Sequence, residues 1–282
     1  AAMLIGVVLA VGLMSSTAIY RQALDDLGLK FDLRQADKTE LDLLISTSNH
    51  LVEPGAYERD QRIIEAQLDS LSGLLSGRTR TATSATFFLT EPGQPVTDDP
   101  ARPRSRFQFL TGLTSQILVD QGIFPRSAVA EPDLAPPVEV ALGTDAAAAF
   151  SVGLGDEFDL HPFWRDDRAP VRAVIVALIS PIDYSDEYWR QRRDHFEVPT
   201  ERWDTYAFFV PEATFFDVLA VYLPDMNADL ETIGYSSLSS LNSRNAELAA
   251  TQLRDVSSTI AGQVERARID SELSTVLDTF GE

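Results

Sequence analysis

The chain contains no cysteine, and this absence removes a whole set of structures and chemistries. Disulfide bonds, thiolate metal sites, iron-sulfur clusters and cysteine nucleophiles all require the thiol group. Stability must therefore come from packing of the core. The absence of cysteine does not identify a compartment, because a protein outside the cytoplasm can also avoid thiols that would be oxidised there.

Basic residues are also scarce. The 282 residues include 23 Lys and Arg against 43 Asp and Glu, so the formal net charge is -20. A negative field of this size repels polyanions, and we therefore expect no nucleic acid partner. Hydrophobic residues at 44% and charged residues at 23% are ordinary for a globular protein, which excludes disorder over most of the chain.

Histidine is nearly absent, and no common catalytic or metal-binding spacing includes it. His50, His161 and His195 lie far apart, without HExxH or similar spacing. The chain has neither a GxSxG nucleophile elbow nor a GxxxxGK[ST] phosphate loop. The segment GLGDEF at 153–158 lacks the third glycine of a dinucleotide loop, and it is interpreted as a β-turn capped by Asp156. We predict that the chain is not an enzyme, and we predict no catalytic residue, no cofactor and no metal.

The first twenty residues carry no side chain that is charged at neutral pH, and the first charge is Arg21. Twenty helical residues at about 1.5 Å per residue span roughly the 30 Å hydrocarbon core of a bilayer. We predict a transmembrane helix and stalk over 1–30, in which Leu24 and Leu27 continue the helical spacing. The alternatives for the apolar segment are a cleaved signal peptide and a buried core helix.

Apolar periodicity predicts the main elements of the remaining chain. Helices are expected over Tyr57–Leu75 and Ser239–Val264, and another helix begins at Ser271. The run Val171–Ser180 is nearly all apolar, which is typical of a strand buried on both faces. Proline, glycine and aspartate in residues 91–104 indicate an exposed loop.

Taken together, these elements predict an α+β fold. A strand-helix-strand unit occurs before the β-rich stretch and another occurs after it. We predict a membrane-proximal sheet-and-helix subdomain from residues 31–135 and 211–270, built from these two units. An inserted small β subdomain is predicted over 136–210, and residues 271–282 are predicted to start a helix leading to a second span.

Several segments in fixed order resemble one known family. They are LVDQGIFP at 118–125, VEVALGTDAAAAFSVGLGDEFDL at 138–160, VRAVIVALISPIDYSDEYW at 171–189 and a strand-helix pair at 206–219. With the leading apolar span, this order resembles the extracytoplasmic domain of FtsX-like (MacB-like) permeases of ATP-binding cassette (ABC) transporters. The resemblance covers nearly the whole chain. It departs at QGIFP in 121–125, where many members have Gly-Arg-x-Pro, so no role of that arginine is carried over.

The resemblance implies a mechanical function. In this family a cytoplasmic ATPase moves the membrane helices, and the outer domain relays the movement to an outer partner or cargo. The work is export, lipoprotein release or activation of a cell-wall hydrolase. For this chain the resemblance implies the cell membrane as location, with the bulk of the chain extracytoplasmic. It also implies an ATP-binding cassette subunit as partner and a dimer in the full transporter.

Two other classes of function stay open from the sequence. The first is an extracytoplasmic ligand-sensing domain of a membrane receptor, which would also follow an N-terminal span and be α+β. The second is a membrane-anchored hydrolase, which would need a catalytic cluster in a cleft.

Aromatic and acidic residues gather in one loop, DYSDEYW at 183–189. It lacks the glycine and the terminal glutamate of an EF-hand calcium loop. Because aromatic side chains dominate interface hot spots, we predict possible partner contacts at Tyr184, Tyr188, Trp189 and Trp164. The alternative is a structural loop in which Trp189 packs inward.

Overall fold

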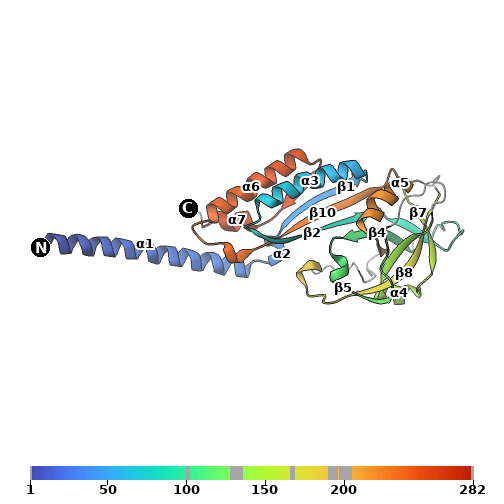
Figure 1. The fold of residues 1–282 in the computed structure, drawn as a ribbon, viewed down its shortest axis with the longest axis horizontal. Coiled ribbons are helices and arrows are strands. Elements are labelled where there is room, and N and C mark those ends of the chain that lie inside the picture. Colours follow the sequence, from blue (N-terminus) through green and yellow to red (C-terminus); the bar gives the residue numbers. More distant parts are fainter. Residues whose placement is uncertain are drawn as a thin grey trace. The chain divides into compact units, whose positions relative to one another are not determined.

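The computed structural model describes residues 2–99, 102–127, 136–165, 169–189, 196 and 205–280, with side chains from Ile19 onward except that of Pro54. The chain divides into two compact units. Unit 1 comprises Ala1–Ile45, Arg62–Arg78 and Ile233–Glu282, and unit 2 comprises Ser46–Gln61 and Thr79–Thr232. The fold is mixed α+β, as predicted, and its elements are labelled in Figure 1. The predicted 136–210 insert lies within the larger unit 2, so whether it folds independently stays a prediction.

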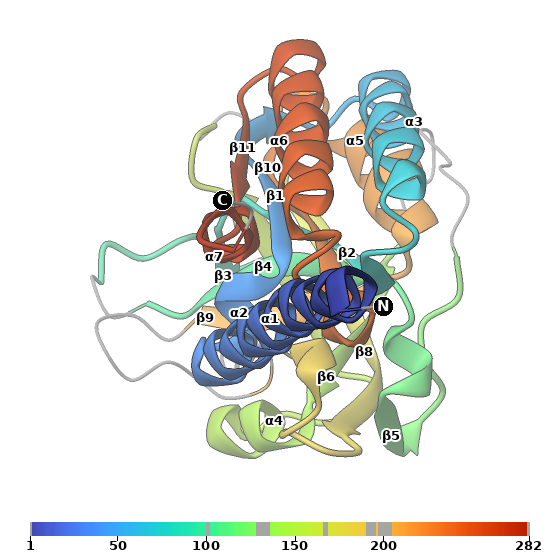
Figure 2. The ribbon, with the colours of Figure 1, turned by 90° about the vertical axis from the view of Figure 1, so that its left-hand side faces the viewer.

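Unit 1 is built from helices and one end of a sheet. Its strands lie in the order β11-β1-β10-β2. Helices α3 and α6 lie side by side next to these strands (Figures 1 and 2). The elements wholly or partly in unit 1 are α1 (Ala2–Gln35), α2 (Lys38–Leu41), β1 (Leu43–Leu51), α3 (Pro54–Ser70), β2 (Leu75–Ser84), β10 (Asn227–Ser236), η5 (Leu238–Ser240), α6 (Ala246–Gln263), β11 (Ala267–Asp270) and α7 (Leu273–Asp278).

The core of unit 1 follows the helical periodicity of the sequence. On α6, the apolar residues Ala249, Leu253, Val256 and Ile260 are all buried, which confirms the predicted amphipathic face. They pack in one cluster with Leu68 of α3 and with residues of β1. The structure begins this helix at residue 246 rather than 239, because the short η5 turn comes before it.

Helix α1 has two distinct faces where its side chains are described. Leu29 and Leu33 are buried in the core of unit 1, whereas Leu24, Leu27 and Phe31 are exposed. Among the residues whose side chains the structure describes, no helix combines the length and the apolar character needed to cross a bilayer. The predicted span over residues 1–20 lies outside those residues, apart from its last two.

Strands of unit 2 close into a ring. They pair in the order β4-β3-β7-β8-β6-β9, and β4 also pairs in parallel with β9. Strand β5 pairs with β8 outside this path. The elements that lie wholly in unit 2 are β3 (Phe87–Thr90), β4 (Arg104–Leu110), η1 (Leu113–Ser115), β5 (Ile117–Gly122), β6 (Val138–Gly143), α4 (Thr144–Phe150), β7 (Glu157–Pro162), β8 (Val171–Pro181), η2 (Glu187–Trp189), β9 (Thr205–Phe209), η4 (Thr214–Leu219) and α5 (Ala220–Tyr222).

Unit 2 has two separate hydrophobic cores, one on each face of these strands, and successive side chains along a strand point to one core and then the other. On β9, Phe208 belongs to the larger core, whereas its neighbour Phe209 belongs to a smaller core with Trp189. Strand β8 serves both cores because its pairing with β6 shifts by one residue near Val176. A bulge reverses which face the following side chains occupy, so Ile175 lies in the larger core and Ala177 in the smaller one.

Most elements predicted in this unit are present, with two differences. The apolar run predicted as a buried strand is β8. The helix of the strand-helix pair expected over 206–219 is present, but its middle is a π-helix, η4, with phenylalanines 215 and 216 buried. Strands β3 and β4, assigned from sequence to the membrane-proximal subdomain, share the ring with β6 to β9.

Candidate functional site: an aromatic loop and a ligand pocket

The 183–189 loop is held together by its own side chains. Asp183 accepts hydrogen bonds from the backbone N–H and the hydroxyl of Ser185, at 2.8 and 2.7 Å. These two hydrogen bonds lower the pKa of Asp183. Asp186 accepts the N–H of Tyr188 at 2.8 Å and so begins the η2 turn. Local bonds of this kind fix the loop in a turn conformation.

Three of the four predicted contact residues pack against a common neighbour or against each other. Trp189 is only 1% exposed, and its ring meets those of Tyr188 and Phe196 edge-on at centroid distances of 4.7 and 5.0 Å. The Tyr188 hydroxyl donates to the carbonyl oxygen of Thr111 at 3.0 Å. Tyr184 packs edge-on against Phe196 at 6.0 Å. The inward-packing alternative therefore describes Trp189, and contact of these residues with a partner stays a prediction.

The fourth residue, Trp164, lies elsewhere in unit 2. Its half-buried ring packs edge-on against Phe87 at 5.3 Å and against Phe163 at 5.4 Å. Phe163 itself is 53% exposed. The structure thus places Trp164 in the larger core of unit 2, and the loop residues 184, 188 and 189 belong to the smaller one.

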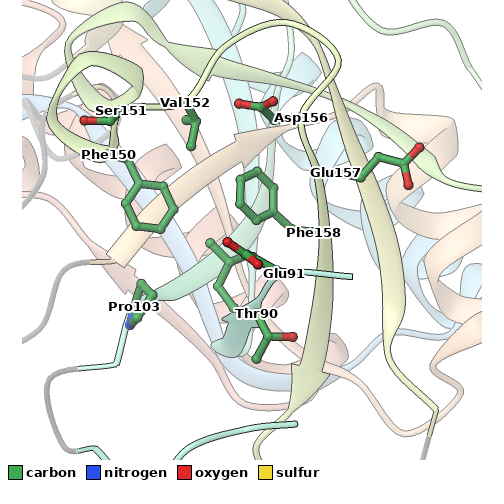
Figure 3. A pocket seen from close by; sticks show the side chains of 10 residues that line it. Thr90, Glu91, Pro103, Phe150, Ser151, Val152, Asp156, Glu157 and Phe158 are labelled. Carbon is green, nitrogen blue, oxygen red and sulfur yellow. The ribbon is translucent and has the colours of Figure 1, made fainter. Parts of the chain in front are cut away.

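A pocket of about 460 Å³ opens in unit 2 beside β3 and β7 (Figure 3). Figure 3 shows the rings of Phe150 and Phe158 turned toward the pocket, and the Glu157 carboxylate pointing away from it. The two rings stack at a centroid distance of 6.0 Å. The residues that line the pocket are Leu89, Thr90, Glu91, Pro103, Phe150, Ser151, Val152, Asp156, Glu157 and Phe158.

The pocket combines apolar walls with negative charge, and none of its lining residues is basic. Asp156 accepts the N–H of Gly153 at 2.8 Å, and Glu157 lies 3.9 Å from Arg172. No described residue donates a hydrogen bond to the Glu91 carboxylate. Aromatic faces beside a carboxylate suit an apolar group that carries a positive charge. Such a pocket would serve the ligand-sensing alternative.

A buried ion pair lies on β7 next to this pocket. Asp159 is 4% exposed and accepts a hydrogen bond from Nε of Arg172 at 2.9 Å and from the N–H of Gly93 at 2.7 Å. Burial opposes ionisation of Asp159, but these hydrogen bonds, with the charges of Arg172 and His161, outweigh it and lower its pKa. Asp159 of β7 thus connects Gly93, in the segment that follows β3, with Arg172 of β8.

His161 follows on the same strand. Its Nε2 lies 3.1 Å from the hydroxyl of Thr90, within hydrogen-bond distance. Burial lowers the pKa of His161, and the negative charge of Asp159 opposes this effect only in part. The folded protein therefore favours the neutral imidazole.

We predict that this histidine makes stability depend on pH. Its folded pKa lies below the usual value of about 6.5, so the unfolded state binds more protons as the pH falls through that range. Stability should decrease from pH 7 toward pH 5 and level off below the folded pKa. His161→Gln should remove this part of the slope, measured by urea unfolding at several pH values. The lowered pKa of Asp159 affects stability only from about pH 5 downward, as the pH falls through its unfolded pKa of about 3.9, and so leaves most of this range to His161. Parallel stability curves for the two proteins would contradict the prediction.

His50, the other histidine that the structure describes, belongs to no metal-binding group. His50 lies 3.4 Å from Asp60, a residue of the first turns of α3, and His195 lies outside the described residues. Across the part of the chain that the structure describes, no three His, Asp or Glu side chains gather closely enough to hold a metal ion. The 153–158 segment forms the predicted turn, because Asp156 caps Gly153 and Gly155 has a φ of +85°.

The sequence analysis missed the pocket and the exposed edge of β5. The pocket depends on Glu91, Pro103 and Phe158, which come from three separate places in the chain. Nothing in their local patterns signals that they meet. The β5 edge does have a local signal in the sequence. Leu118 and Val119 are adjacent apolar residues rather than alternating with polar ones, so at least one of them cannot face the core, and both are exposed.

Comparison with known proteins gave matches among solved structures only. No protein-family model matches the chain, and no curated protein matches it. The chain is similar to the periplasmic region of MacB from Actinobacillus actinomycetemcomitans, at 13% identity over 89% of this chain and 97% of that chain, with a TM-score of 0.40.

Two further structures are similar over most of their length. The extracellular domain of the noncanonic ABC-type transporter YknZ from Gram-positive bacteria is 9% identical over 80% of this chain and 98% of that one, with a TM-score of 0.38. A domain of a putative permease protein from Porphyromonas gingivalis is 7% identical over 84% and 90%, with a TM-score of 0.35.

Proposed function

We propose that this chain is the extracytoplasmic part of an ABC transporter permease, anchored in the cell membrane through residues 1–20 and lacking catalytic activity of its own. In this proposal an ATP-binding cassette subunit drives the membrane helices, and the chain relays their movement to an outer partner or cargo in a dimeric transporter. The order of sequence motifs described above supports this assignment.

One observation carries the proposal, namely that α1 and α7 pack together within unit 1. A Cβ added at Gly28 of α1 would lie 3.0 Å from the ring of Phe280, just after α7. Leu273 and Leu277 of α7 are buried in the same core as Leu29 of α1. Two helices near opposite ends of the chain therefore leave unit 1 as neighbours, which suits a domain inserted between two membrane spans.

Hydrogen bonds join the segments next to these helices, the end of α2 after α1 and the residue before α7, to the sheet of unit 1. The carbonyl oxygen of Leu41 accepts the hydroxyls of Ser236 on β10 and Ser271 before α7, at 2.6 and 3.2 Å. The buried Asp42 accepts the N–H of Ser236 at 2.9 Å. Because the joints are bonded and buried, a change in the spacing of the two helices would be passed to β10 rather than absorbed by a loose linker.

The test uses the absence of cysteine. In the intact permease with its cassette subunit, Arg21→Cys on α1 and Thr279→Cys after α7 would be labelled with a membrane-impermeant maleimide spin label in right-side-out vesicles. Both side chains are exposed. We expect labelling without lysis, and a change in the distance between the labels on the order of a few ångström when ATP is loaded inside.

The control pair is Ser72→Cys and Gln263→Cys, two exposed sites within unit 1 away from the two helices. Its label distance should not change with nucleotide. Labelling of Arg21→Cys and Thr279→Cys only after lysis would contradict the extracytoplasmic location. Labelling from outside with an unchanged distance would contradict the relay.

A further inference from the structure

Strand β5 has an open edge. It pairs antiparallel with β8, and no strand among the described residues pairs with its other edge (lower right in Figure 2). Residues 118–122 are all exposed, whereas Ile117 is buried in the smaller core of unit 2. The strand is thus anchored at its first residue and accessible along the rest. An open strand edge offers unpaired N–H and C=O groups to another chain.

The ladder with β8 shows which backbone groups are available. The N–H of Ile182 donates to the carbonyl of Gln116, and the N–H of Ile123 donates to the carbonyl of Val176, both on the β8 side. In an antiparallel pair every second residue turns its backbone groups toward the partner strand. The groups of Val119 and of Gly122, on the two sides of the bulge at Asp120, therefore point away from β8.

Apolar side chains surround this edge. Leu118 is 55% exposed, Val119 44% and Ile123 76%. Leu154 and Ile182, both also exposed, lie next to the two ends of the strand, because Leu154 approaches Gly122 and Ile182 bonds to Gln116. Scattered exposed apolar residues are normal, but a group of them beside unpaired backbone is typical of an interaction site.

The one charged residue of β5, Asp120, does not prevent another strand from pairing with the open edge. Both carboxylate oxygens of Asp120 are occupied, by the hydroxyl of Thr144 at 2.5 Å and by that of Ser180 at 3.2 Å. The bulge thus turns this side chain onto the protein's own surface. Edge strands that avoid pairing normally carry an outward charge, often lysine, and β5 has none.

The charge around the edge selects the kind of partner. Residues 116–123, 144–145 and 176–183, which make up β5 and the segments bonded to it, contain Asp120, Asp145 and Asp183 but no lysine or arginine. A second copy of the chain paired through its own β5 edge is disfavoured, because it would bring the same acidic residues next to these. A positively charged segment is favoured for the same reason.

We propose that the β5 edge, residues 118–123, binds an extended, apolar and positively charged segment of a partner protein, which adds to the sheet as a further strand. Backbone hydrogen bonds to Val119 and Gly122 would supply register, and the apolar side chains around them would supply contact area. This inference goes beyond the proposed function, which does not say where a partner binds. It also holds whether or not the chain relays movement.

The test uses a displayed library of random dodecapeptides, selected on the whole chain in detergent micelles. The blocking variant is Val119→Pro, which removes an N–H that points away from β8 and so should leave the fold intact. Selected peptides should alternate apolar and other residues and carry lysine or arginine. They should bind Val119→Pro at least about tenfold more weakly, the effect of losing one good hydrogen bond and the strand fit.

Two measurements on the best synthetic peptide locate it. Hydrogen exchange at the amides of Val119 and Gly122 should slow on binding, whereas exchange at Leu118, already bonded to β8, should change little. Replacing the peptide's basic residues with glutamate should weaken binding at low salt. The control variant is Leu248→Ser, which removes an exposed apolar side chain of α6 and should bind like the unmodified chain.

Several outcomes would overturn the proposal. They are the failure to select any peptide that distinguishes Val119→Pro, protection of amides away from β5, and preference for acidic peptides. A concentration-dependent dimer that Val119→Pro abolishes would also overturn it, because a second copy would then be the occupant. A thermal melt of each variant verifies that the fold is intact.

Discussion

Trp189→Ala should lower the free energy of unfolding of unit 2 by roughly 3–5 kcal/mol, the usual cost of truncating a buried tryptophan to alanine. The ring is 1% exposed and fills the smaller core of unit 2 beside Phe196 and Phe209. Its removal would leave a cavity that strands on both sides cannot close, because Ile179 and Phe209 sit on paired β-strands. Urea unfolding followed by circular dichroism measures the loss.

Two control variants separate packing from surface contact. Trp189→Phe keeps most of the ring contacts and should lower the free energy of unfolding clearly less than Trp189→Ala does. Trp164→Ala removes a tryptophan that is only half-buried, and its loss of unfolding free energy should lie between those of the two Trp189 variants. If Trp189→Ala left the unfolding curve unchanged, the ring would not be a core residue in solution, and its predicted role as a partner contact would be strengthened.

Gly122→Ala should be the most damaging single-methyl substitution in β5. Gly122 has a φ of +79°, a left-handed conformation that costs other residues about 1–3 kcal/mol. The new Cβ would also overlap the carbonyl oxygen of Val176, an atom of the β8 backbone that cannot rotate away. We therefore expect a loss above about 3 kcal/mol, or detachment of β5 from β8. Urea unfolding and amide exchange along β5 distinguish these results.

Gly155→Ala is the matched control for this substitution. Gly155 has nearly the same backbone, with a φ of +85°, but a Cβ added there would meet nothing within 4 Å. It should therefore show the backbone cost alone. Equal losses at the two positions would mean that the close approach of Gly122 to Val176 contributes nothing.

Local patterns were sufficient for much of the secondary structure. The spacing of Leu253, Val256 and Ile260 predicted the buried face of α6, and the apolar run at 171–180 predicted the strand β8. The predicted burial on both faces is wrong for the first half of β8, where Arg172 is exposed and Val174 and Val176 are only half-buried. These signals work because helix and strand periodicities are properties of a few neighbouring residues. The π-helix η4 has no such signature, since its extra residue per turn depends on packing of Phe215 and Phe216.

The pairing of strands could not be predicted in the same way. Strand β9 aligns Phe208 with Phe107 of β4, which lies about a hundred positions earlier in the chain. Nothing in the local sequence of either strand indicates that the two pair. The predicted boundary at residue 136 reflected a change in composition, and composition does not report which strands pair.

The candidate site shows the same limit. Tyr184, Tyr188 and Trp189 were predicted as partner contacts from their residue type. Aromatic residues are common both in interfaces and in cores, so residue type does not distinguish an interface residue from a core residue. Only the burial of Trp189 distinguishes the two, and burial depends on Ile117 and Phe209 from distant strands. The hydroxyl partners of Asp120 could not be predicted either, because Thr144 and Ser180 come from other elements.

The parallel junction of Arg104–Gln108 with Thr205–Phe209 has a consequence for biogenesis. Synthesis proceeds from the first residue, so about a hundred residues must emerge after β4 before its last neighbour arrives. Contacts between residues so far apart along the chain form slowly, and Phe107 and Phe109 of β4 would stay exposed until β9 pairs with it. A nascent chain of this protein should therefore depend on a holding chaperone until its final third has been made.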